Sequence, residues 1–162
     1  MDRDETEAPS NEGTDAAKHD KNLEFRVTDQ IGFILRLAHQ RANANLAEKL
    51  THLELTPAQA VVLARLAERG SVSQNLLGRL VAMEPANIRD VVLRLKRRRF
   101  ISQDRDQADR RLVLLRLTPA GDTMARKLIP ISMKNVQEIL SPLSPRERDT
   151  LRALLKRISG VE

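Results

Sequence analysis

One segment, from Ser73 to Leu117, constrains the fold of this 162-residue chain more than any other. Its first half has helical apolar spacing in two short stretches, the first capped by Ser73 and the second opened by Pro85. Its second half places a polar turn rich in Asp and Arg between strand-like residues at Ile101 and from Leu112 onward, which indicates a β-hairpin. A helix of this size fits the major groove of duplex DNA, and an Arg-tipped hairpin fits the minor groove. The segment therefore predicts a winged helix-turn-helix.

The residues that precede this unit are predicted to form two helices. Residues 27–50 carry apolar side chains on two faces, so we expect one face to pack within the subunit and the other against a second copy. The run Thr56-Pro57-Ala58-Gln59 is a capping box that opens the next helix, and Gly70 is expected to end it.

Two more helices are predicted after the hairpin. Thr118-Pro119 opens the first of them, and Pro130 is expected to kink it. A second capping box begins at Ser144 and opens a final helix, which Gly160 ends.

These elements predict a mainly α fold with a small β-hairpin wing, organised in three parts. Residues 1–24 are polar and acidic, and we expect them to be a disordered tail. Residues 56–118 are the winged helix-turn-helix DNA-binding domain. Residues 25–55 and 119–162 together are expected to form a helical dimerisation region.

The charge of the chain is unevenly distributed. The net charge is +6, but residues 1–24 hold eight acidic and three basic side chains, so the remainder carries +11. Such a field attracts polyanions, although basicity alone fits DNA, RNA and anionic membranes alike. The aromatic inventory consists of three phenylalanines, which disfavours a site for unpaired bases.

The sequence lacks the motifs that are typical of several other classes of protein. Cysteine is absent and the three histidines, His19, His39 and His52, are dispersed, so we expect no thiol chemistry, no metal centre and no cofactor. No apolar stretch resembles a signal peptide or spans a bilayer, so a cytoplasmic location without membrane contact is expected. The sequence shows no nucleophile with its base and no phosphate-binding loop, so it does not predict an enzyme.

The helix opened by Pro85 has a buried stripe and a polar outer face. Helical spacing puts its apolar residues on one side and leaves the others opposite or on the flanks, namely Ala86, Asn87, Arg89, Asp90, Leu93, Arg94 and Arg97. Asn87 suits adenine and Arg89 suits guanine, whereas Arg94 and Arg97 suit phosphates. Asp90 either accepts from cytosine or orients Arg94 four residues later. Taken alone, this helix also fits a solvated charged face.

Two further charged runs support DNA contact. Residues 96–99 are four adjacent cations, which suit either phosphate neutralisation or the negative end of a helix dipole. Residues 104–111 alternate Asp and Arg, so one arginine can be braced while another projects toward a narrow minor groove. The alternative for this turn is a hairpin held by surface ion pairs, each worth about 0 to 1 kcal/mol.

The run from Arg105 to Gly121, RDQADRRLVLLRLTPAG, resembles the wing signature of the MarR (multiple antibiotic resistance regulator) family of transcription factors. The order of the predicted elements agrees with that family from about Asp29 to Ile158. The resemblance implies an obligate dimer formed by the first and last helices. It also implies binding to a pseudo-palindromic operator and release by a small ligand.

Position by position, the resemblance also implies which residues contact DNA. Asp109 and Arg111 match the Asp-x-Arg pair of the wing, Arg110 lies at its tip, and residues 85–97 match the recognition helix. The implied DNA contacts are Ser73, Gln74, Pro85, Ala86, Asn87, Arg89, Asp90, Arg94, Arg97, Asp109, Arg110 and Arg111. Arg99 stands where the family usually has glycine, and Pro130 is a second departure.

A site for the effector is expected on the first helix, because family pockets lie between the dimer helices and the winged domain. The candidates are Phe33, Arg36, Leu37, His39 and Arg41. The two arginines suit a carboxylate, and His39 either contacts the ligand or is an ordinary histidine. The stretch from Gln30 to Arg41 is similar to family members that govern aromatic-acid catabolism.

The sequence thus predicts a homodimeric, ligand-responsive regulator of transcription, with repression as the leading mode. Its expected partners are double-stranded DNA, a second copy of the chain and a small-molecule effector. The alternative is a non-specific architectural DNA-binding protein, because basicity and a wing serve that function too. Resistance of the complex to competitor DNA separates the two predictions.

Overall fold

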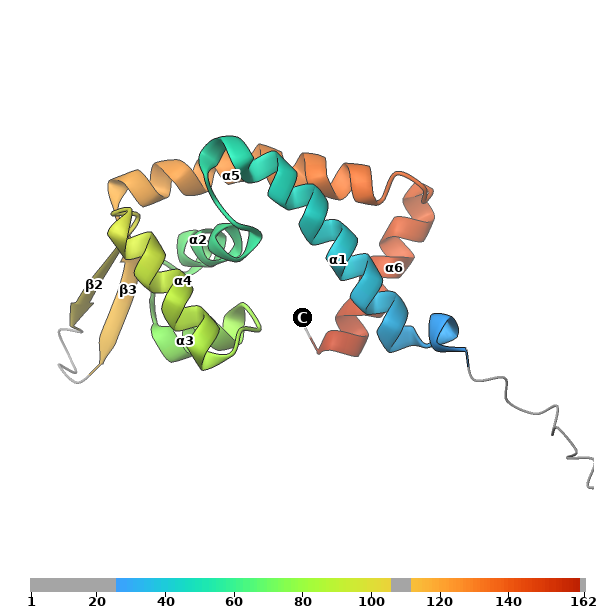
Figure 1. Ribbon diagram of the computed structural model, residues 1–162, viewed down its shortest axis with the longest axis horizontal. Helices are drawn as coiled ribbons and strands as arrows, with labels where there is room; N and C mark the ends of the chain where they lie inside the picture. The colour runs from blue at the N-terminus through green and yellow to red at the C-terminus, as the bar shows by residue number, and fades with distance from the viewer. Residues whose placement is uncertain (1–25, 106–111, 161–162) are drawn as a thin grey trace, which may run out of the picture.

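A computed structural model describes residues 26–105 and 112–160. The elements in chain order are η1 (Val27–Asp29), α1 (Ile31–Leu50), η2 (Thr51–Leu53), α2 (Pro57–Arg69), β1 (Ser71–Ser73), α3 (Gln74–Leu80), α4 (Pro85–Arg97), β2 (Ile101–Arg105), β3 (Val113–Leu117), α5 (Pro119–Ile139) and α6 (Pro145–Ser159). A lobe of α2, α3, α4 and the strands lies at one end, α1 and α6 extend at the other, and α5 spans both (Figure 1). The mainly α fold with a winged helix-turn-helix unit is confirmed.

The hydrophobic core lies in the winged lobe. Its largest fully buried side chains are Leu50, Leu63, Leu66, Leu77, Leu95, Leu115 and Val62. Leu50 enters this core from the end of α1, and Ala125 and Leu128 enter it from the first half of α5. Both flanking helices are therefore anchored in the lobe that carries the helix-turn-helix.

The sheet has three strands in the order β1-β3-β2, with both neighbouring pairs antiparallel. Leu115 on the central strand lies opposite Val72 of β1 and Gln103 of β2. The sequence predicted only the hairpin of β2 and β3, because three residues are too few to show strand periodicity. β2 also continues to Arg105, into the run that was predicted to be all turn.

The predicted helix signals are confirmed at both capping boxes. The Thr56 amide donates to Gln59 Oε1 at 2.9 Å, and the Gln59 amide donates to Thr56 Oγ1 at 3.2 Å. Ser144 and Glu147 form the equivalent pair at the start of α6, which ends at Gly160 in the left-handed conformation. The N-terminal helix starts later than expected, at Ile31, after one separate 3-10 turn.

Pro130 does not end α5, which continues as one helix to Ile139. Proline lacks an amide hydrogen and so frees the carbonyl group of Arg126, four residues earlier. Both residues are exposed, so water can satisfy that carbonyl. The helix can therefore extend beyond the winged lobe toward α6.

Candidate nucleic-acid interface

The helix-turn-helix is held together by close packing of α3 on α4. Ile88, Val92 and Leu95 turn the apolar side of α4 into the core. Gly78 on α3 allows this approach, since a Cβ atom there would lie 3.3 Å from Ile88 Cγ2 and 3.3 Å from the Met83 carbonyl oxygen. This packing leaves the opposite side of α4 free to face a partner.

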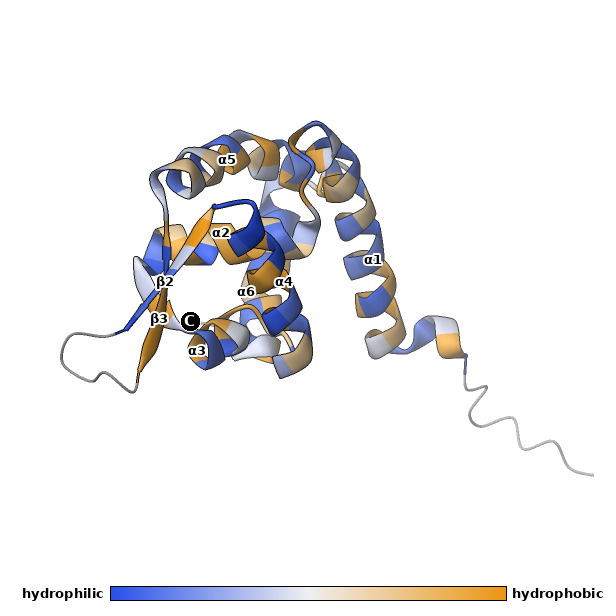
Figure 2. Ribbon diagram, turned by 60° about the vertical axis from the view of Figure 1, so that its left-hand side comes forward, coloured by the Kyte–Doolittle hydropathy of each residue, from blue (hydrophilic) through white to orange (hydrophobic). Residues whose placement is uncertain are grey.

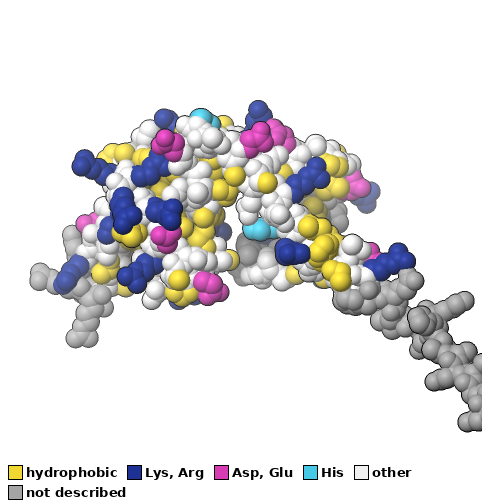
Figure 3. Space-filling model, in the orientation of Figure 1, with side chains coloured by type: hydrophobic (Ala, Val, Ile, Leu, Met, Phe, Trp, Pro, Cys, Tyr) yellow, Lys and Arg dark blue, Asp and Glu magenta, His cyan; other side chains and the backbone are white. Residues whose placement is uncertain are grey.

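The outer face of α4 is exposed at every residue predicted to contact DNA, namely Pro85, Ala86, Asn87, Arg89, Asp90, Arg94 and Arg97. Arg94 Nε donates to Asp90 Oδ2 at 2.9 Å, which favours the interpretation that Asp90 orients Arg94. Within the described part of the chain, Arg89 and Arg97 have no hydrogen-bond or ion-pair partner, so their guanidinium groups are available to phosphates or base edges. Cationic side chains are distributed over the winged lobe in Figure 3.

The start of α3 carries the two other predicted contacts of the helix-turn-helix. Ser73 Oγ accepts from the Leu76 amide at 3.3 Å and caps the helix, and Ser73 and Gln74 are both half-buried. Two exposed residues of α3, Asn75 and Arg79, were missed in the sequence. Helical spacing opposite buried Leu77 is the signal that indicates them.

The wing is only partly described. Asp109, Arg110 and Arg111, which were predicted to contact the minor groove, lie outside the described residues. At the base of the wing, Arg116 Nε on β3 donates to Ser71 Oγ on β1 at 3.2 Å. This bond and the ladders on both sides of β3 fix the wing beside α3 and α4.

The four cations of residues 96–99, for which the sequence left phosphate neutralisation and the helix dipole as alternatives, lie in different environments. Lys96 Nζ hydrogen-bonds to Gln103 Oε1 on β2. Arg98 is half-buried, and its Nη1 donates to the Glu54 carbonyl oxygen at 2.5 Å. Arg97 and Arg99 are exposed, so they are the members of the run that remain suited to phosphates.

Arg99 adopts the conformation that glycine usually supplies after such a helix, with φ of 60°. Its amide donates to the Lys96 carbonyl oxygen at 2.8 Å, and the Phe100 amide donates to the Leu95 carbonyl oxygen at 3.0 Å. These two bonds form a Schellman motif, in which a left-handed residue ends the helix. The turn is therefore retained, and Arg99 carries the strain of a left-handed non-glycine residue.

The effector candidates on α1 divide between two sides of the helix. Arg36 lies over the ring of Phe33, with 5.1 Å from its guanidinium carbon to the ring centroid, and His39 Nε2 lies 2.7 Å from Asn43 Nδ2. At 100° per residue, Arg36 and His39 share one side, whereas Arg41 lies some 160° around the helix from His39. Leu37 also lies away from His39, on the side of Arg41.

His39 continues a stripe that leads into the core. Asn43, Leu46 and Leu50 follow it at helical spacing, and Leu50 is fully buried in the winged lobe. His39 therefore faces the same side as the core, at a level where α1 has left the lobe. Figure 3 shows the surface hollowed between that lobe and the α1 end of the molecule.

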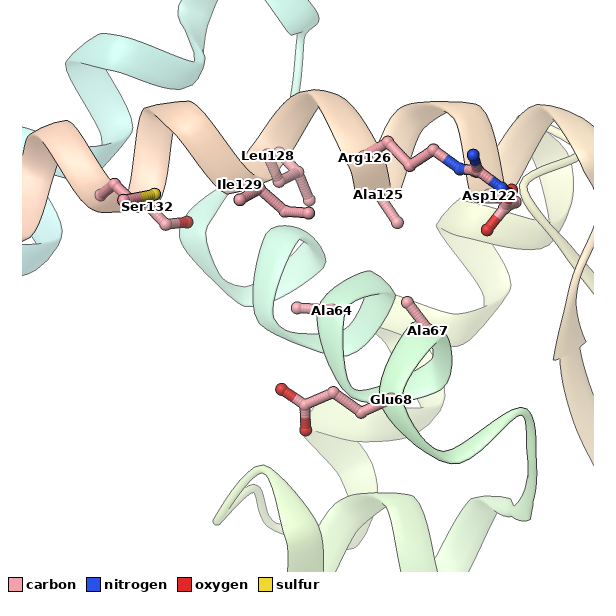
Figure 4. A pocket seen from close by; sticks show the side chains of 10 residues that line it. Ala64, Ala67, Glu68, Asp122, Ala125, Arg126, Leu128, Ile129 and Ser132 are labelled. Atoms are coloured by element: carbon pink, nitrogen blue, oxygen red, sulfur yellow. Dashed lines mark hydrogen bonds and ion pairs between the residues drawn. The ribbon is translucent and has the colours of Figure 1, made fainter.

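A separate groove of about 430 Å³ lies between α2 and α5 (Figure 4). Its apolar lining includes Ala64, Ile129 and Met133, and none of the five effector candidates lines it. Arg126 at its rim donates to Asp122 Oδ2 at 2.7 Å, so the cation of this groove is already paired. Arg36 on α1, by contrast, has an aromatic contact and no carboxylate partner within the described residues.

Two other site types were searched for in the described ranges. No cluster of three or more metal-ligating side chains occurs in residues 26–105 and 112–160. Over the same ranges, no helix combines the length and the apolar character needed to cross a membrane.

A helix-turn-helix whose second helix exposes arginines, followed by a hairpin of β2 and β3 that pairs with β1 in a three-stranded sheet, defines a winged-helix DNA-binding protein. The chain belongs to the MarR family, whose model matches residues 55–113. The transcriptional repressor NicR of Pseudomonas putida is 33% identical over 137 residues, covering 85% of this chain and 87% of the repressor. Members of this family are transcriptional regulators, so the protein is a regulator and not an enzyme.

Two solved structures agree with this assignment. A probable transcriptional regulator from Pseudomonas aeruginosa is 44% identical with a TM-score of 0.77, covering 82% of this chain and 99% of that one. BpsR of Bordetella bronchiseptica, whose DNA binding is regulated by 6-hydroxynicotinic acid, is 33% identical with a TM-score of 0.79. The match with BpsR covers 85% of this chain and 99% of that one.

Proposed function

We propose that this protein is a homodimeric repressor that binds a pseudo-palindromic operator and releases it when a small aromatic carboxylate binds. The observation that carries the proposal is the outer face of α4, where Arg89 and Arg97 are exposed and unpaired among the described residues. The arginines supply phosphate and guanine contacts, and the Asp90–Arg94 pair holds a third cation in place.

The dimer is supported by apolar surface that no described residue of the protomer covers. No residue of α6 is buried, and Ile158 is 67% exposed. Ile31 on α1 and Met133 on α5 are 65% and 61% exposed. An isolated 15-residue helix is marginal in water, so α6 needs a partner surface, and a second copy provides one by two-fold symmetry. The hydropathy colouring of Figure 2 shows apolar residues recurring along α1 and α5.

An aromatic carboxylate is supported by the chemistry of α1 and by the relatives. Arg36 offers a cation without a carboxylate partner in the described chain, and Phe33 beside it offers an aromatic face. His39 is exposed and lies on the side of α1 that leads toward the core. BpsR responds to 6-hydroxynicotinic acid, which has the same combination of a flat ring and a carboxylate. Hydroxylated pyridine and benzene carboxylates are therefore the effector class that we propose.

The test is binding of the purified protein to duplex DNA that flanks its own gene, followed by fluorescence anisotropy. A specific repressor is expected to withstand roughly a thousand-fold excess of random duplex and to lose the complex when 6-hydroxynicotinate or a hydroxybenzoate is added. Arg89→Ala is expected to weaken specific binding by about 1–3 kcal/mol. Complexes that random duplex removes at equal concentration would favour the architectural alternative.

The dimer has its own measurement. Sedimentation of wild type and of Ile158→Asp is expected to give a dimer and a monomer, because a buried, unpaired carboxylate opposes association. Arg157→Gln, one residue earlier on the same helix, makes the net charge more negative by the same one unit and is the matched control. If the wild type and Ile158→Asp were both monomeric, the proposal would be contradicted.

A further inference from the structure

Arg98 directs its side chain into the protein, unlike its neighbour Arg97. Its Nη1 donates to the Glu54 carbonyl oxygen at 2.5 Å, and its Nη2 donates to the Leu53 carbonyl oxygen at 3.2 Å. The Glu54 carboxylate lies 3.6 Å from Nη2, and the Phe100 ring centroid lies 4.9 Å from the guanidinium carbon. The side chain is 30% exposed. Its polar contacts within the described chain thus lie on one short segment.

That segment is the connection that leaves α1. Leu53 ends the 3-10 turn η2, and Glu54 has a left-handed backbone with φ of 53°. Carbonyl groups at the end of a helix lack partners within it and carry partial negative charge. The planar guanidinium group of Arg98 satisfies two neighbouring carbonyls at once, which an ammonium group does less well.

Arg98 is also the C-cap residue of α4, directly after Arg97. Its backbone precedes the left-handed turn at Arg99, and its amide donates to the Arg94 carbonyl oxygen at 3.2 Å. One side chain therefore ties the end of the helix that faces DNA to the connection that follows α1. The two contacts join residues 44 and 45 positions apart in the chain.

We propose that Arg98 is a positioning residue for operator recognition, which fixes α4 relative to α1 and so sets the separation of the two recognition helices in the dimer. The inference rests on the proposed function, since it needs a dimer on a two-part operator. A phosphate contact would make the strength of binding depend on Arg98. A positioning role makes the preferred half-site spacing depend on it.

The experiment uses a palindromic duplex that the full-length wild-type protein selects from a random library. Versions with the spacer lengthened and shortened by one base pair are compared, each over a range of salt concentrations. Arg97→Ala is the matched control, because it is the adjacent exposed arginine. It is expected to weaken binding to all duplexes alike. It should also reduce the number of counterions released on binding, measured from the slope of log K against log salt concentration, by about one.

With Arg98→Ala, the number of counterions released on binding is expected to stay within about half an ion of the wild-type number. The ratio of affinities for the selected spacing over the altered spacings is expected to fall by tenfold or more. Arg98→Lys keeps the charge and loses the two-pronged geometry, so it is expected to behave like Arg98→Ala. If Arg98→Ala is poorly folded, Arg98→Lys alone carries the test.

Two results would overturn the inference. If Arg98→Ala releases about one counterion fewer on binding and keeps the wild-type spacing preference, Arg98 is a phosphate contact. Variants that match wild type in both readouts would remove any role in recognition. If the wild-type protein shows no preference for one spacing, the proposed function itself is overturned. The spacing preference of the wild type is therefore measured before that of any variant.

Discussion

The winged lobe and the α1–α6 end of the molecule are built from equally good helices, yet only the lobe buries them. In the lobe, α2 and α4 place Leu63 and Leu95 in the core with no exposed surface. At the other end, α6 has a complete capping box and a left-handed terminal glycine, but no buried residue. The capping residues at the helix ends therefore favour helix formation equally well in both regions. What differs is whether the apolar face meets another face of the same chain.

The comparison separates two sources of stability. Burial inside the lobe is intramolecular and does not depend on concentration. Burial of the outer faces of α1, α5 and α6 requires a second molecule under the proposed function, so it follows mass action. Four experiments test this difference between the two regions.

The largest effect is expected from Leu63→Ala in the lobe. Removing this fully buried side chain should lower the free energy of unfolding by about 2–5 kcal/mol at any protein concentration. Leu154→Ala on α6, which is 47% exposed, should change the unfolding of a protomer by less than about 0.5 kcal/mol and raise the dimer dissociation constant instead. Denaturant titrations at two protein concentrations measure both. Equal losses for both variants at low concentration would break the comparison.

Gly121→Ala should follow, because the start of α5 touches the turn after α4. A Cβ atom at Gly121 would lie 2.0 Å from the Phe100 carbonyl oxygen, a backbone atom. We expect a loss of about 3 kcal/mol, at the upper end of overpacking effects, measured by thermal unfolding. Gly32→Ala on α1 is the control, since nothing lies within 4 Å of that position. It should gain up to about 1 kcal/mol, and a loss at Gly32 would mean that α1 is already covered.

Arg99→Gly should stabilise the lobe by about 1 kcal/mol, because glycine adopts a positive φ without the strain of a side chain. Arg89→Gly, which removes the same side chain within α4, should instead cost about 1 kcal/mol. Thermal unfolding without DNA compares the two. A loss in both would show that the Arg99 side chain has a stabilising contact that outweighs its backbone strain.

The smallest effect concerns the ion pair of Lys49 on α1 with Glu138 on α5. The hydrogen bond from Lys49 lowers the pKa of Glu138 below its ordinary value, with a further contribution from Asn45. A carboxylate with a lowered folded-state pKa stabilises the fold above its unfolded pKa of about 4.3, and that stability is lost as the pH falls through the folded value. Glu138→Gln should therefore be less stable than wild type at pH 7, with the difference closing in acid. Lys49→Met should lose the same pH dependence, and an unchanged pH profile in both variants would contradict the assignment.

The features that could be predicted from the sequence are those that depend on neighbours along the chain. The capping residues Thr56, Ser73 and Ser144 each accept from the amide three positions later, so their pattern can be recognised without tertiary structure. The apolar stripe of α4 could be predicted for the same reason, and the position of the stripe predicted which residues of α4 face outward. Strand β1 could not be predicted, because its three residues are defined only by pairing with β3.

The candidate site shows the same division. The exposed contacts on α4 follow from helical period alone, whereas the separate roles of Arg97 and Arg98 do not. Both are arginines in one basic run, and only the approach of residues 53–54 to the end of α4 turns one of them inward. Arg99 is a similar case, since its departure from glycine was visible in the sequence but its left-handed φ was not.

The helices, their capped starts, the order of the winged unit and the family to which the chain belongs could all be predicted from the sequence, because these depend on local spacing and on short motifs. The burial of particular apolar faces, the internal contact made by one cation of residues 96–99 and the pairing of the third strand become visible in the folded chain alone. Those features depend on groups far apart in the chain. Their positions are set by how the helices pack, and packing is a property of the whole chain that no single stretch of sequence encodes.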